Sequence, residues 1–155
     1  MMGRKLWLLL IARIFLGTVF AYAGFSKLME PYENFRGALA EYRVIPYGVV
    51  GAVAAILPWL ELIFGVFLIL GYAVRLSALV STFLAGGFLV VLGASQLFYG
   101  SIPASCGCFG EQGIHLTVSQ VMSLDFLDFL IGLKLVSTRQ HAFSLDAWFR
   151  KTSIA

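Results

Sequence analysis

The chain has 155 residues, of which 60% are hydrophobic and 12% are charged, and its mean hydropathy is +0.91. This composition excludes an ordinary soluble domain and indicates a protein that is solvated by a lipid bilayer. The formal net charge of +3 comes mostly from basic residues near the ends of apolar segments. It is therefore a signal of membrane topology and gives no reason to predict nucleic-acid binding.

Four apolar segments are long enough to cross a hydrocarbon core about 30 Å thick, which takes roughly 20 helical residues. They cover residues 6–29, 47–71, 76–99 and 118–137. The sequence therefore predicts an all-α fold, a four-transmembrane-helix bundle that forms a single integral membrane domain over residues 1–155.

The first segment partly resembles a secretory signal, because two basic residues precede an apolar stretch that contains Ala21-Tyr22-Ala23. Arg13 divides that stretch, which favours a retained helix. Gly17 and Gly24 share one face of this helix with Ala21. Small residues in such a row predict close packing against a neighbouring helix.

The connection to the second span is predicted to contain a short interfacial helix. Pro31 and Pro46 bound this connection, since proline suits helix starts and not helix interiors. Between them, Phe35, Leu39 and Tyr42 recur at helical spacing, with charged residues on the other face. This pattern indicates an amphipathic helix on the membrane surface in the first outer loop.

Ionisable residues within the spans are candidate functional groups, because a charge at membrane depth is costly and usually has a partner or a task. Arg13 and Glu61 are expected to pair, either as a structural ion pair that fixes helix register or as the polar wall of a quinone or substrate pocket. Lys27, near the outer end of its helix, is expected to meet Asp125 and Asp128 or the cysteine loop. Arg13, Glu61 and Lys27 are thus the candidate cofactor-binding residues.

Both cysteines lie in the outer loop, residues 100–117, which has no Lys or Arg. Basic residues gather on the opposite side, so both termini and the tail, residues 138–155, are predicted to be cytoplasmic. Cys106 and Cys108 would then face a periplasm or cell exterior, where disulfides persist. Thr117 and Gln120 fit a capping box at the start of the fourth span.

The spacing of Cys106 and Cys108 favours redox exchange. A disulfide between them must bend the chain at Gly107, and so tight a ring is strained and adds little stability. Two alternatives stay open: an inert dithiol, and a zinc or soft-metal site made by the two cysteines with His115, with Glu111 in reserve.

Several motifs, in order along nearly the whole chain, resemble the MauE branch of the DoxX-like membrane proteins. They are Arg13-x3-Gly17, Gly24-Phe25-Ser26-Lys27-Leu28, Tyr42-Arg43-Val44-Ile45-Pro46, Pro58-Trp59-Leu60-Glu61-Leu62, Gly65, Arg75 and Cys106-Gly107-Cys108-Phe109-Gly110. The resemblance implies a four-helix membrane bundle that supports disulfide formation or maturation of an exported dehydrogenase subunit.

The resemblance also implies partners: a periplasmic thioredoxin-like protein or exported client, reached from the bacterial inner membrane. Cys106 and Cys108 would be the catalytic pair that exchanges disulfides with it. A quinone held between the helices is expected from the similarity of this fold to other four-helix membrane thiol oxidoreductases. A non-catalytic maturation or accessory subunit is the alternative function.

Overall fold

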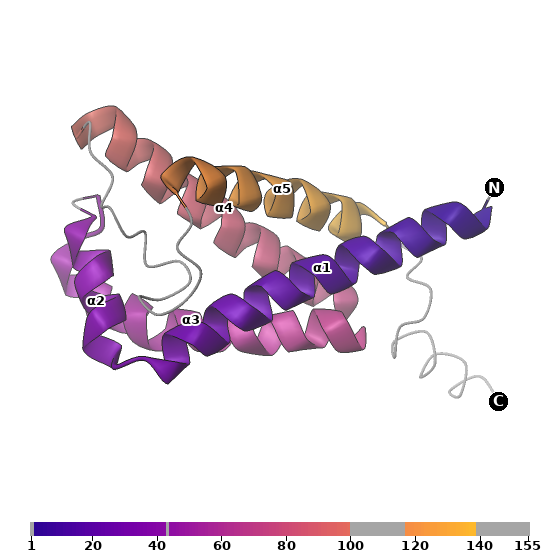
Figure 1. Cartoon of the computed structure of the whole chain (residues 1–155), viewed down its shortest axis with the longest axis horizontal. Coiled ribbons are helices and arrows are strands. Elements are labelled where there is room, and N and C mark those ends of the chain that lie inside the picture. The colour runs from indigo at the N-terminus through magenta and orange to yellow at the C-terminus, as the bar shows by residue number, and fades with distance from the viewer. Residues whose placement is uncertain (1, 43, 100–116, 139–155) are drawn as a thin grey trace.

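The computed structural model describes residues 2–42, 44–99 and 117–138. This part of the chain forms five helices: α1 (Met2–Met29), α2 (Tyr32–Glu41), α3 (Tyr47–Leu70), α4 (Val74–Tyr99) and α5 (Val118–Ser137). The four long helices run back and forth, and α2 lies at one end of the bundle (Figure 1). The predicted all-α bundle is confirmed, and the short helix occurs where the sequence places it.

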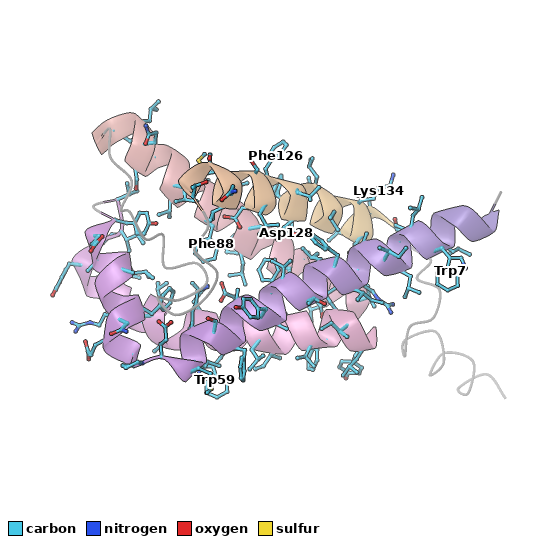
Figure 2. All side chains as sticks on the ribbon, in the orientation of Figure 1. Trp7, Trp59, Phe88, Phe126, Asp128 and Lys134 are labelled. Atoms are coloured by element: carbon cyan, nitrogen blue, oxygen red, sulfur yellow. The ribbon has the colours of Figure 1, made fainter. Side chains whose placement is uncertain are left out.

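Three of the described helices are long and apolar enough to cross a membrane, over Leu6–Met29, Tyr47–Leu70 and Val74–Phe98. The 20 residues of α5 rise about 30 Å, which also matches the hydrocarbon core. Phe126 points away from the bundle and Asp128 points into it (Figure 2). An apolar outer face with an inward carboxyl group suits α5 to the role of the fourth span.

The helix ends have clear local causes. Pro31 follows the end of α1 and Pro46 directly precedes α3, as predicted, and Pro31 also directly precedes α2. The backbone N–H of Thr117 donates to Oε1 of Gln120 at 2.9 Å, so the predicted capping box is confirmed. Gly71 ends α3 with φ 73°, a left-handed conformation that favours glycine, and lets the chain turn directly into α4.

Glycines allow α1 and α3 to cross in close contact. A Cβ atom on Gly17 would lie 2.8 Å from the carbonyl oxygen of Gly65, and one on Gly24 would lie 2.6 Å from that of Pro58. Neither position can hold a larger side chain without moving backbone. The predicted small-residue face of α1 is therefore the face that packs on α3.

These contacts set a large stagger between α1 and α3. Gly24, near the end of α1, lies beside Pro58, which is close to the middle of α3. The first half of α3 therefore extends past the end of α1, and α2 covers it instead. Phe35 and Leu39 of α2 pack there against Val50 and other buried residues of α3.

The helices α3 and α4 separate as they leave their short connection, and α5 packs most extensively on α4 (Figure 1). Gly132 of α5 touches Thr82 of α4, where an added Cβ atom would clash with the threonine hydroxyl. At the opposite end, α2 packs on α3 and faces α4 across a groove. This arrangement leaves room between the three helices.

Candidate functional site

A buried ion pair joins α1 to α3. The ammonium nitrogen of Lys27 donates to both carboxylate oxygens of Glu61, at 2.8 Å and 2.6 Å. Only 3% of Lys27 and 1% of Glu61 is exposed. Gly24, which precedes Lys27 by three residues on α1, lies against α3 at Glu61: a Cβ atom on Gly24 would be 3.0 Å from Cβ of Glu61. This close approach brings the two charged side chains together.

The prediction that Arg13 pairs with Glu61 is wrong. Arg13 precedes Lys27 by 14 residues, or about 21 Å along α1. Because Gly17 already lies beside Gly65 and Ile69, the antiparallel register carries Arg13 beyond them, toward the far end of α3. Arg13 is buried on α1, but it belongs to a different level of the bundle.

The aspartates of α5 reach the same level as the ion pair. Asp125 and Asp128 line a small cavity together with Lys27 and Glu61. Its volume of about 20 Å³ is enough for one water molecule, and its walls offer the polar partners that a buried water needs. Lys27 was expected to meet these aspartates or the cysteine loop. It lines the cavity with the aspartates, but its salt bridge is made to Glu61, and the cysteine loop lies outside the described residues.

Asp128 is the most deeply placed of these carboxyl groups on α5. It is 1% exposed, and its Oδ1 atom makes no hydrogen bond to the residues that the structure describes. A buried carboxylate oxygen without a hydrogen bond is costly, so it is expected to be protonated or to bind a water molecule or a ligand. The cavity that it shares with Lys27 gives such a group a place.

Two aromatic rings complete the surroundings of Lys27. Its ammonium nitrogen lies 5.2 Å from the ring centres of Phe35 on α2 and Phe88 on α4, within cation–π range. With Glu61 on α3 and Asp128 on α5, all five described helices contribute to this cluster. Phe35 was predicted only as part of the apolar face of the short helix, and Phe88 was not predicted at all, since one of many apolar residues in a span carries no signal of its own.

An apolar groove adjoins the cluster. It has a volume of about 250 Å³ and lies between α2, α3 and α4. Phe35 and Phe88, the two rings beside Lys27, also line it. Among the described residues, Phe88 alone borders both the groove and the small polar cavity, and Figure 2 shows it inside the bundle.

The predicted catalytic pair, Cys106 and Cys108, lies outside the described residues, as do Glu111 and His115. Among the residues 2–42, 44–99 and 117–138, no group of three or more His, Cys, Asp or Glu residues could hold a metal ion. The alternative metal site, made by Cys106, Cys108 and His115, lies outside these ranges.

Comparison with known proteins identifies the family. The profile of the family described as methylamine utilisation protein MauE matches residues 5–137. The methylamine utilization protein MauE of Paracoccus denitrificans is 33% identical over 122 residues, which cover 77% of this chain and 61% of that relative. No solved structure gives a significant match. The chain belongs to the MauE family of membrane proteins.

Proposed function

We propose that this protein is a membrane component of a thiol–disulfide relay, in which Cys106 and Cys108 exchange disulfides with an exported partner. The observation that supports this most is the charged cluster in the half of the bundle where α2 lies. Both cysteines lie between α4 and α5 in the sequence, and α4 ends and α5 begins in this half of the bundle (Figure 1). The proposed redox pair and the buried charged cluster would thus lie in the same half of the bundle.

The proposed reaction is disulfide transfer. A thiolate of the partner attacks the Cys106–Cys108 disulfide and forms a mixed disulfide, and a second partner thiolate then displaces the bound cysteine. The partner leaves with a disulfide, and Cys106 and Cys108 are left as thiols. To restore their disulfide, two electrons and two protons must pass to an acceptor, for which we propose a membrane quinone.

The partner would be a thioredoxin-like protein or an exported client in the periplasm of a bacterium, with both termini of this chain in the cytoplasm. The name of the Paracoccus relative supports a role in methylamine utilisation. We propose that role for this chain as well, with maturation of an exported dehydrogenase subunit as the task.

Partner trapping in cells tests the proposal. With Cys106→Ser or Cys108→Ser, the remaining thiol should form a mixed disulfide that no internal cysteine can resolve. This species should accumulate on non-reducing gels, disappear with reductant and identify the partner by mass spectrometry. Ser105→Ala, next to the pair, is the matched control and should trap nothing.

Two other results would overturn the relay. Stoichiometric zinc or copper in the purified protein, lost with Cys106→Ser or His115→Ala, would establish the metal site instead. If the cysteine variants trap no partner and still support maturation of the client, the protein is an accessory subunit without thiol chemistry.

A further inference from the structure

We propose that the groove between α2, α3 and α4 is the binding site of an isoprenoid quinone. The ring would lie against Phe88 beside the Lys27–Glu61 pair, and the tail would leave past Phe83 into the lipid. This inference rests on the proposed function, because the relay needs an acceptor for two electrons. Lys27 and Glu61 were already candidate cofactor-binding residues, and the inference adds the apolar groove that would hold the acceptor beside them.

The groove has the character of a site for a lipid-soluble molecule. Its walls are almost entirely apolar and come from three helices, as in ligand sites between the helices of other bundles. Phe83, on the groove wall, is 77% exposed on the outside of α4. The groove therefore opens toward the lipid and can admit a ligand from the membrane.

Lys27 lies behind the part of the groove wall that Phe35 and Phe88 form, and it carries a donor that suits a quinone carbonyl. Lys27 uses two hydrogen-bond directions on Glu61, and an ammonium group has three N–H donors. The third donor makes no hydrogen bond to a described residue, and the two rings beside it, Phe35 and Phe88, face the groove as well. The hydrocarbon part of a lipid chain has no acceptor for this donor, whereas a quinone carbonyl oxygen could accept a hydrogen bond from it.

The polar cavity behind Phe88 suits proton transfer to the same ligand. Reduction of a quinone by two thiols breaks two S–H bonds, forms one S–S bond and forms two O–H bonds on the ring. Asp128 and Asp125 line the cavity with Lys27 and Glu61, and the cavity has room for one water molecule. These groups can transfer protons to a quinone oxygen that is hydrogen-bonded to Lys27, along a path that does not pass through the lipid.

A glycine in the groove wall allows a direct test. Gly87 lines the groove, and a Cβ atom on it would have no neighbour within 4 Å. Gly87→Leu should fill the groove without disturbing the helix packing. Gly93→Leu is the matched control, because Gly93 lies on the same helix, has equally open space and does not line the groove.

The experiment uses the full-length protein in lipid nanodiscs with ubiquinone that carries two isoprene units. Saturable binding is expected, with at least a tenfold loss in Gly87→Leu, a smaller loss in Gly87→Ala and no change in Gly93→Leu. An azido derivative of the same quinone should label peptides of α2, α3 and α4 in the native protein, so the test does not depend on the variants alone. The isoprenoid alcohol without the ring should compete poorly.

Equal binding by native protein and Gly87→Leu would overturn the site, as would labelling confined to other helices. Equal competition by the isoprenoid alcohol would show a groove for lipid chains instead of a quinone site. The Cys106→Ser, Cys108→Ser double variant should bind quinone as the native protein does, so quinone binding is measured separately from disulfide exchange. If quinone binds in the groove but no partner is ever trapped, the relay fails and the site stands; if a partner is trapped but no quinone binds, the site fails.

Discussion

Removing one member of the Lys27–Glu61 pair should be far more harmful than removing both. Lys27→Met leaves a buried carboxylate and Glu61→Gln leaves a buried ammonium, and each such loss costs about 3–5 kcal/mol. The double variant leaves only the buried amide of Gln, which costs about 1–3 kcal/mol if it finds no partner. The single losses add to at least about 6 kcal/mol, so we expect a coupling energy of at least about 3 kcal/mol.

The assay is the free energy of unfolding in mixed micelles, titrated with a denaturing detergent for the native protein and all three variants. Arg13→Met combined with Glu61→Gln is the control cycle. Because Arg13 lies about 21 Å along α1 from Lys27, its loss should add to that of Glu61 within about 0.5 kcal/mol. Additive losses for Lys27 and Glu61, or strong coupling between Arg13 and Glu61, would refute the register of α1 on α3.

Two further predictions concern packing and topology. Gly65→Ala should lower the unfolding temperature clearly, since its Cβ atom would meet the backbone of Ala21 and Gly17. Gly37→Ala in α2, where the Cβ atom has open space, should raise the free energy of unfolding by about 0.5–1 kcal/mol. Equal effects of the two variants would contradict the close crossing of α1 and α3. Cys106 and Cys108, once reduced, should react with a membrane-impermeant maleimide added to intact spheroplasts, and labelling only after the membrane is opened would reverse the proposed orientation.

Most of the fold follows from local signals in the sequence. Apolar length predicts the four long helices, Pro31 predicts the end of α1, Pro46 predicts the start of α3, and the Thr117–Gln120 pattern predicts the start of α5. These signals are reliable because each depends on a few neighbouring residues and on the thickness of the bilayer. They say nothing about how far one helix is displaced along another.

That displacement explains the error in the predicted ion pair. Pairing Arg13 with Glu61 assumes that α1 and α3 end at the same level. In the structure, α2 replaces α1 along the first half of α3, so the last turn of α1, with Lys27, lies at Glu61. The contacts of Gly17 and Gly24 with α3 fix this stagger, and such contacts between distant segments cannot be read from hydropathy.

The same glycine contacts bear on why the charged pair is present. A buried ion pair can serve to fix register, but here two glycines already hold α1 against the backbone of α3 at separate points. Apolar side chains of similar size could fill the space of Lys27 and Glu61 with equal or greater stability. A charge retained at this cost, between a cavity lined by Asp128 and an apolar groove, is better explained by a ligand or proton that uses it. The Lys27→Met, Glu61→Gln double variant should therefore recover folding without recovering quinone binding or disulfide formation in the client, whereas recovery of all three would reduce the pair to a structural contact.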